Sequence, residues 1–426
     1  MLGRPCRKYP SCARRLGLYG FGVSKLTCES WLNRTVVGIG LASLFSDWSH
    51  EIATTVMPAF LASMGVAAIW LGLIEGVSDG ISSFAKMGSG YYTDGLQRRK
   101  PIAVIGYVVT GLGTAAFGLA TAAWHVLLAR ACAWLGRGVR TPVRKALLAS
   151  AVTPQTYGRA FGFERMMDTV GAIVGPATAL VLLNAFDHHY PPLFAVTLVP
   201  SLIAAGLIAF LVQEKERKRV PHIAFGARLR ALPRAYRKFL LAVGFFGLGG
   251  FAHTLLILLA TQKLTPTLGA NRAASTAVGL YVLHNVCYAS FAAIGGWLGD
   301  RLPKKWLLAS GYLLSALMSL AIITLAPSVW TFVLVFTLGG TNVALEETLA
   351  DSLCAELVDA AHHGMAFGVL ATVNGIGDFF SSLIVGGLWT AVGTGAAFGY
   401  SFILSVLGAA LILTLGTQAN RKADPI

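Results

Sequence analysis

The residues of this chain best suited to chemistry are acids and bases that lie inside long apolar stretches. Asp47 and Glu51 are four residues apart in the first such stretch, so a helix would place both on one face. Two carboxylates this close in a low-dielectric setting repel each other when both are charged, so together they can bind and release a proton. The spacing indicates a proton-coupling or substrate site. The alternative is a structural hydrogen-bond cluster that includes Trp48 and His50.

The next apolar stretch repeats this spacing with Glu75 and Asp79, and Lys86 follows two turns further along the same face. An ionisable group inside a membrane is costly unless it faces a cavity or a partner, so each is a functional candidate. We expect Lys86 to neutralise one of these acids in an internal network, with substrate contact as the alternative. Asp378, deep in a later stretch, is a further candidate for proton or substrate binding.

Two further stretches carry charges of opposite sign. In the fourth stretch, Arg137, Arg140 and Arg144 fall on one helix face, where guanidinium groups could attract an anionic solute. In the tenth stretch, the charged residues are acids. The predicted cavity or gate residues are Arg137, Arg140, Arg144, Lys145, Glu346, Glu347 and Asp351.

The elements that position these residues follow from composition. Hydrophobic residues make up 55 % of the 426 and charged residues 12 %, against about a quarter charged in soluble domains. Mean hydropathy is +0.66, which excludes an ordinary soluble domain. A membrane-spanning helix needs roughly 20 apolar residues, so we predict an all-α integral membrane protein with twelve transmembrane helices. The predicted spans are 35–61, 69–91, 101–121, 124–149, 160–184, 191–212, 239–262, 275–298, 305–326, 329–352, 365–391 and 394–417.

The charges between the spans predict the topology. Apart from Lys263 and Arg272, the cations fall in alternate connections, which places those connections and both termini in the cytoplasm. The net charge of +15 then reflects membrane topology, and we expect no nucleic-acid partner. Within the linker, the pattern favours either a short basic amphipathic helix or a solvated connection. The predicted units are a basic N-terminal tail at 1–34, six-helix halves at 35–212 and 239–417, a cytoplasmic linker at 213–238 and a tail at 418–426.

An internal repeat relates the two halves. A shift of 206 residues superposes Gly90-x-x-x-Asp94 on Gly296-x-x-x-Asp300. Because six predicted spans, an even number, separate the copies, both halves enter the membrane in the same direction and form parallel repeats.

The same shift pairs cations of one half with acids of the other. Arg140 corresponds to Glu346, and Lys145 corresponds to Asp351. We therefore expect a gate on the cytoplasmic side, in which Arg140 and Lys145 approach Glu346, Glu347 or Asp351. The alternative is that each charge is satisfied within its own half.

The repeated loop resembles that of the major facilitator superfamily of secondary transporters, and the resemblance covers about residues 35–417. In that family, the loop between the second and third helices has the form G-x-x-x-D-(R/K)-x-G-R-(R/K). It latches the two halves together in one alternating state, and by analogy Asp94 would accept hydrogen bonds or lie near a helix N-terminus. The alternative is that Arg98, Arg99 and Lys100 only anchor the topology. The resemblance assigns the latch to Gly90, Asp94, Arg98, Arg99, Gly296, Asp300, Arg301 and Lys304.

A second motif lies in the fifth predicted span. Gly171-x-x-x-Gly175-Pro176 resembles the start of the family's fifth-helix motif, which is associated with antiporters. Glycines four apart allow close helix contact and proline bends a helix, so a packing role is the alternative. The resemblance also implies that spans 1, 4, 7 and 10 line a cavity between the halves.

The resemblance implies alternating-access transport of a small molecule, which we expect to be proton-coupled export by antiport. The alternatives are proton-coupled uptake of an anionic solute, a membrane enzyme acting on lipid substrates, and a sensor that binds without transport. No HExxH motif supports an enzyme, and the six scattered cysteines indicate no metal site. We expect no cofactor and a monomer in the lipid bilayer of a prokaryotic inner membrane, with a small molecule and protons as its partners.

Overall fold

The computed structural model describes residues 30–66, 68–187, 189–214, 224–251 and 253–415, and these residues are helical without a β-strand. Most of the predicted basic N-terminal tail, the tail at 418–426 and positions 215–223 of the linker lie outside the described residues.

The first half of the chain forms six rods of membrane-spanning length. They are α1 (Arg34–Ser63), α2 (Ala68–Asp94), α3 (Lys100–Ala115) continued by η1 (Ala116–Leu119), α4 (Ala123–Ser150), α5 (Tyr157–Ala185) preceded by η2 (Pro154–Thr156), and α6 (Tyr190–Val196) with α7 (Leu198–Leu211).

The second half repeats this arrangement. A short helix, α8 (Phe225–Ala231), lies in the linker between the halves. The six rods that follow are α9 (Arg234–Gly249) with α10 (His253–Leu268), α11 (Ala270–Gly299), α12 (Lys304–Thr324), α13 (Val329–Leu357), α14 (His363–Ala391) preceded by η3 (Ala360–His362), and α15 (Thr394–Leu413).

Two of the predicted spans are broken in the structure rather than continuous. The sixth is divided between α6 and α7 at Thr197, three residues before Pro200, whose missing N–H leaves a helix carbonyl without its partner. The seventh is divided between α9 and α10, where Gly250 is extended with ψ 178° and the α-helix ends. Glycine is the residue that most readily leaves a helix, so the Gly249–Gly250 pair accounts for this break.

Hydropathy alone does not identify every one of these membrane-spanning rods. In the described part of the chain, eight helical segments are long and apolar enough to cross a membrane. The rods that fall short are α1, α2 and α4, which carry acids and bases along their length, and the divided α9 and α10. Of the rods that fall short, α2 and α4 contribute charged residues to the candidate site described below.

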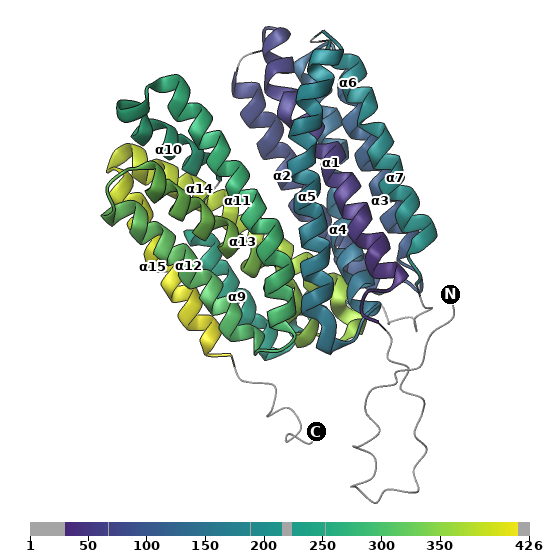
Figure 1. The fold of residues 1–426 in the computed structure, drawn as a ribbon. Helices are drawn as coiled ribbons and strands as arrows, with labels where there is room; N and C mark the ends of the chain where they lie inside the picture. Colours follow the sequence, from purple (N-terminus) through teal and green to yellow (C-terminus); the bar gives the residue numbers. More distant parts are fainter. Residues whose placement is uncertain (1–29, 67, 188, 215–223, 252, 416–426) are drawn as a thin grey trace, which may run out of the picture.

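The two halves meet at one end of the bundle and diverge toward the other. Figure 1 shows the halves in contact at the end where α1 begins and α15 ends, which we call the base. Toward the opposite end, α10 and α11 lie apart from α1 and α2 (Figure 1). Glycines allow the close approach at the base: a Cβ on Gly90 would lie 2.1 Å from the carbonyl oxygen of Gly364, and one on Gly158 would lie 2.2 Å from that of Gly296.

The fifth-helix motif brings α5 against α1 inside the first half. A Cβ on Gly171 would lie 2.4 Å from the carbonyl oxygen of Leu44, and one on Gly175 would lie 2.3 Å from the Cβ of Glu51. Pro176 follows inside the helix. The glycines therefore set the distance between α5 and the α1 face that carries Asp47 and Glu51.

Candidate functional site between the two halves

A cavity of about 500 Å³ lies between the halves, lined by α2, α4 and α5 on one side and mainly by α9, α13 and α14 on the other. Its two walls differ in charge. The first half contributes cations together with Asp168, and the second half contributes acids. The charged lining residues are Lys86, Arg137, Arg140, Arg144, Lys145, Arg165, Asp168, Glu346, Glu347, Asp351 and Asp378.

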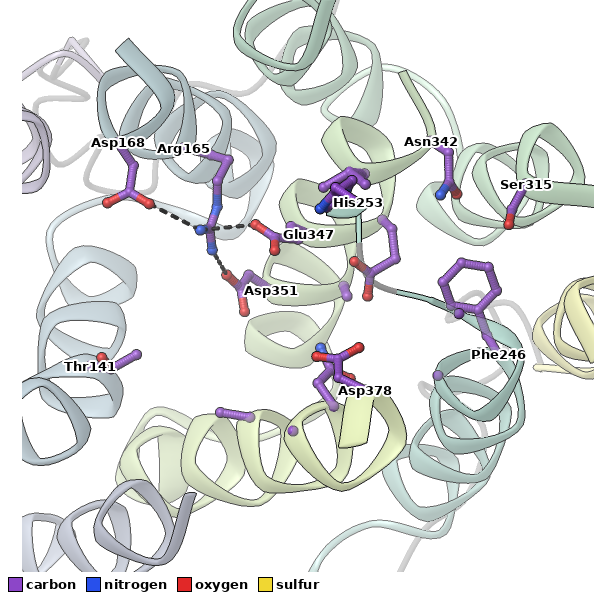
Figure 2. Close-up of a pocket in the computed structure, with 18 of the residues that line it drawn as sticks. Thr141, Arg165, Asp168, Phe246, His253, Ser315, Asn342, Glu347, Asp351 and Asp378 are labelled. Carbon is purple, nitrogen blue, oxygen red and sulfur yellow. Dashed lines mark hydrogen bonds and ion pairs between the residues drawn. The ribbon is translucent and has the colours of Figure 1, made fainter. Parts of the chain in front are cut away.

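Ion pairs cross between the halves on the base side of this cavity. Lys145 Nζ lies 2.7 Å from Asp351 Oδ1, and both side chains are largely buried. Arg165 lies between three acids, as Figure 2 shows: its distances are 2.9 Å to Glu347, 3.7 Å to Asp351 and 3.2 Å to Asp168. These contacts join α4 and α5 to α13.

The Lys145–Asp351 pair predicted from the repeat is thus formed, whereas the Arg140–Glu346 pair is not. Arg140 donates to the Ser46 hydroxyl at 2.6 Å, and its guanidinium lies 4.0 Å from the centre of the Tyr107 ring. These contacts hold it among α1, α3 and α4. The parallel repeat relates the two halves by an approximate twofold axis, and equivalent residues can touch only near that axis. Lys145 and Asp351 are equivalent residues that lie close to it. Arg140 and Glu346 each lie five residues further along their helices, away from the base.

Asp47 of α1 is held by α4 of the first half, and neither Asp47 nor Glu51 lines the cavity. Asp47 accepts from Arg137 at 3.0 Å, and Glu51 lies 3.8 Å from His50. No residue of α1 lines the cavity, contrary to the expectation that spans 1, 4, 7 and 10 all do so. The reason is that side chains of α4 cover α1. Arg137 nevertheless lines the cavity, and its buried Nη1 has no hydrogen-bond partner in the described structure.

Arg144 is held by a second buried network within the first half. It pairs with Glu164 at 2.8 Å and donates to Ser43, which in turn donates to Glu164. A buried charge without a partner would be strongly destabilising, and here each ion has a partner of opposite charge.

The predicted pairing of Lys86 with Glu75 or Asp79 is wrong. Each carboxylate oxygen of Glu75 accepts a hydrogen bond from Arg130 at 2.9 Å. Asp79 accepts a hydrogen bond from the Trp134 indole at 2.8 Å. The Arg130 guanidinium also stacks over the Trp134 ring, 3.7 Å from its centre. The Arg130 guanidinium takes the place that Lys86 was expected to fill.

Three charged groups therefore face the cavity without a side-chain partner among the described residues. They are Lys86 on α2, Glu346 on α13 and Asp378 on α14. Asp378 points into the pocket in Figure 2. These side chains are available to a solute or a proton.

At the base, Asp94 caps a helix of the opposite half. Its carboxylate accepts from the backbone N–H groups of Gly364 at 2.9 Å and Met365 at 2.8 Å, at the start of α14. Arg99 completes the arrangement at 2.6 Å from Asp94. A carboxylate at a helix N-terminus is favoured because the exposed N–H groups carry partial positive charge.

Asp300 repeats the contact on the other side of the molecule. It accepts from the backbone N–H groups of Gly158 at 2.7 Å and Arg159 at 3.1 Å, and Arg159 also pairs with it through Nε at 2.7 Å. Lys304 pairs with Glu356 of its own half. The Arg301 guanidinium lies over the Trp297 ring rather than between the halves.

Sequence reasoning missed two of the groups that organise this site. Arg165 was not among the predicted site residues, yet it reaches two acids of α13. Arg130 was not among them either, although it pairs with Glu75. The signal for Arg165 was its occurrence with Glu164 and Asp168, since three charges at one end of a membrane helix require partners. No cluster of three or more His, Cys, Asp or Glu suited to a metal occurs in the described residues.

The profile of the Major Facilitator Superfamily matches residues 39–264 and 239–425. The chain belongs to this superfamily of membrane transporters. An uncharacterized MFS-type transporter of Methanocaldococcus jannaschii is 27 % identical over 382 residues, which cover 90 % of this chain and 95 % of that protein. Multidrug resistance protein MdtH of Yersinia pestis is 23 % identical over 366 residues, 83 % of this chain and 87 % of that protein.

Solved structures show the same fold. The FucP transporter in its outward conformation superposes with a TM-score of 0.74 at 16 % identity, covering 90 % of this chain and 99 % of that chain. The human organic anion transporter MFSD10 gives 0.74 at 15 % identity, covering 89 % and 99 %. The protein is therefore a multi-pass membrane protein with two parallel six-helix repeats, as the sequence predicted.

Proposed function

We propose that this protein exports a small molecule in exchange for protons, by alternating access of the cavity to the two sides of the membrane. One observation carries the proposal: Glu346 and Asp378 line the cavity without a side-chain partner in the described structure. Carboxylates in such a position can hold either a proton or a cationic group of the substrate, but not both. This competition is what antiport requires.

The second support for export is the relative whose name states multidrug resistance, MdtH. The Gly171-x-x-x-Gly175-Pro176 motif agrees with it, although close packing of α5 against α1 accounts for the same residues.

In this proposal the base faces the cytoplasm. Arg98, Arg99 and Lys100 follow α2, and Lys304 and Lys305 begin α12, all at the base. Cations of short loops stay on the cytoplasmic side. The structure then represents an outward-facing state, in which Lys145–Asp351, Arg165–Glu347 and the two aspartate caps close the cytoplasmic side.

A second candidate function is uptake of an anionic solute together with a proton. Arg137 supports it, because its side chain is 29 % exposed, lines the cavity and leaves Nη1 without a partner. In this alternative, protonation of Asp47 frees the Arg137 guanidinium to bind the anion. The two candidates place the coupling proton on different carboxylates and are therefore distinguishable.

The test uses inside-out membrane vesicles with an acidified interior. Acridine orange fluorescence reports the pH gradient across their membrane. Tetraphenylphosphonium and ethidium serve as cationic probes and benzoate as the anionic probe, extended by compounds from a growth screen of overexpressing cells. Antiport predicts that a transported cation dissipates the pH gradient. The Glu346→Gln/Asp378→Asn variant should lose this response at equal membrane expression.

The matched control is Asp187→Asn, which removes one carboxylate from an exposed loop residue with φ 48°, a conformation that Asn tolerates. Its response should equal that of the wild type. A full response by Glu346→Gln/Asp378→Asn would contradict antiport through these carboxylates. Proton-linked benzoate uptake that is lost only in Asp47→Asn would favour the second candidate.

A further inference from the structure

An apolar groove of about 930 Å³ runs between α9 and α14 on the outside of the second half. It faces the surroundings rather than the central cavity, since Leu241 is 62 % exposed, Phe245 42 % and Ile376 51 %. The groove is separate from the transport site, although the opposite face of α9 lines the cavity through Phe246 and Gly247.

The α9 wall of this groove is a single stripe with cations at one end and apolar groups along the rest. Arg234, Arg237 and Lys238 occupy the first turns, and Leu241, Phe245 and Leu248 continue the same helix face at spacings of three and four. From residue 234 to residue 248 the stripe is roughly 21 Å long at 1.5 Å per residue. That length matches the headgroup region plus the hydrocarbon of one leaflet, because the whole hydrocarbon core is about 30 Å thick.

The floor of the groove is open because glycine replaces a side chain on the α9 wall. A Cβ added to Gly244 would meet only Val373 Cγ1, at 3.6 Å, an ordinary contact distance. Val369, Val373 and Ile376 form the facing wall on α14. The hollow is therefore apolar on both sides.

The three cations at its rim are exposed and form no ion pair or hydrogen bond within the residues that the structure describes. The sequence contains no Asp or Glu from position 217 to position 299, so no acid of this segment neutralises them. Residues 215–223 include Lys215, Arg217, Lys218 and Arg219 against one acid. Charge therefore disfavours that segment as the occupant of the rim and favours an anion.

We propose that this groove binds an anionic phospholipid. Its phosphate lies among Arg234, Arg237 and Lys238, and one acyl chain follows Leu241 to Leu248 against the α14 wall. A cationic pocket next to an apolar channel of one leaflet's depth fits both parts of such a molecule, and anionic lipids attract basic residues at the membrane surface. The site does not depend on the transported substrate.

The test measures binding of phosphatidylglycerol and phosphatidylcholine to the full-length protein in neutral detergent by native mass spectrometry. The wild type should bind phosphatidylglycerol more tightly than phosphatidylcholine. Arg234→Gln/Lys238→Gln should weaken phosphatidylglycerol binding about 30-fold, which is about 2 kcal/mol for two cations at 1.4 kcal/mol per tenfold change. The matched control is Arg34→Gln/Arg301→Gln, which removes two base-side cations outside the groove and should leave the affinity unchanged.

A second variant tests the acyl-chain part independently. Gly244→Leu fills the groove without removing charge and improves helix propensity, so the fold should tolerate it. It should lower phosphatidylglycerol binding at least tenfold, and sn-glycerol 3-phosphate at millimolar concentration should not displace the lipid from the wild type. Equal binding of both lipids, an equal loss in the control variant, or displacement by glycerol phosphate would each overturn the proposal.

Discussion

At the residue scale, the site is divided between charges that are satisfied and charges that are free. Arg137, Arg144, Lys145 and Arg165 each lie within 3.0 Å of an acid. Burying charges without partners costs several kcal/mol, so these pairs are what allow cations inside the membrane. The unpaired cavity groups, Lys86, Glu346 and Asp378, are then the ones free to respond to solute and protons.

The first prediction concerns Asp47. If Asp47 carries the coupling proton, as in the second candidate function, Asp47→Asn should abolish transport driven by a pH gradient while the protein still reaches the membrane, because an amide cannot exchange a proton and leaves Arg137 without its ionic partner. Glu51→Gln should act in the same direction. Solute flux into proteoliposomes is measured with and without a pH gradient, and Asp187→Asn serves as the control variant. If both variants keep full pH-driven flux, neither α1 carboxylate is the coupling group.

The second prediction concerns the Lys145–Asp351 pair. Lys145→Asp and Asp351→Lys should each lower the transport rate at least tenfold, since removing one partner of a buried pair costs about 3–5 kcal/mol. The double exchange restores opposite charges and should recover a substantial part of the rate. Proteoliposome flux at equal reconstituted protein measures this. No gain of the double variant over the singles would show that the pair is not coupled.

The sequence could predict which residues occupy equivalent positions in the two halves, but not which partner each side chain contacts. The repeat placed Asp94 and Asp300 in equivalent positions, and each accepts from the N-terminus of a helix in the opposite half. It could not place Arg140, because a repeat gives equal depth but not the direction in which a side chain points. Arg140 turns toward Ser46 and Tyr107 and so does not reach Glu346.

At the element scale, glycines decide which helices come close. The sequence predicted that Gly171 and Gly175 allow close contact, and the structure shows that the contacted helix is α1. The breaks at Thr197 and Gly250 were not predicted because apolar residues continue on both sides of each, and hydropathy does not register a change of backbone direction.

The third prediction follows from this packing. Gly175→Val should lower the free energy of unfolding by about 1–3 kcal/mol, the usual cost of overpacking, because its Cβ would collide with Glu51. Gly206→Val is the matched control, since a Cβ there meets nothing within 4 Å. Thermal unfolding in detergent measures both. An equal change in the two variants would contradict the packing role of Gly175.

At the scale of the whole molecule, the two repeats meet about a shared axis at the base. Lys145 and Asp351 are 206 positions apart and touch, as do Phe161 and Phe367, whose ring centres are 5.6 Å apart. Contacts between equivalent residues mark the axis. Motion of one half against the other about such a contact would open the base and close the opposite end.

The fourth prediction is the orientation of this bundle. In a background where the six native cysteines are replaced, single cysteines at Gly95 and Leu302 should react with an impermeant thiol reagent only from the cytoplasm. Cysteines at Thr121 and Gly269 should react from outside. Labelling of intact cells and of inside-out vesicles measures this. Reaction of Leu302 and Gly269 from the same side would contradict the twelve-span topology.

The most direct test of alternating access measures distances between spin labels on the two halves by double electron–electron resonance. Labels at Ser63 and Thr267 report the end opposite the base, and labels at Gln97 and Leu302 report the base. Asp351→Asn removes the ionic partner of Lys145, and loss of such a buried pair is large enough to shift a two-state population strongly. We predict that the Gln97–Leu302 distance then lengthens while the Ser63–Thr267 distance shortens. Distances that stay unchanged at both ends, or that change in the same direction, would contradict the account.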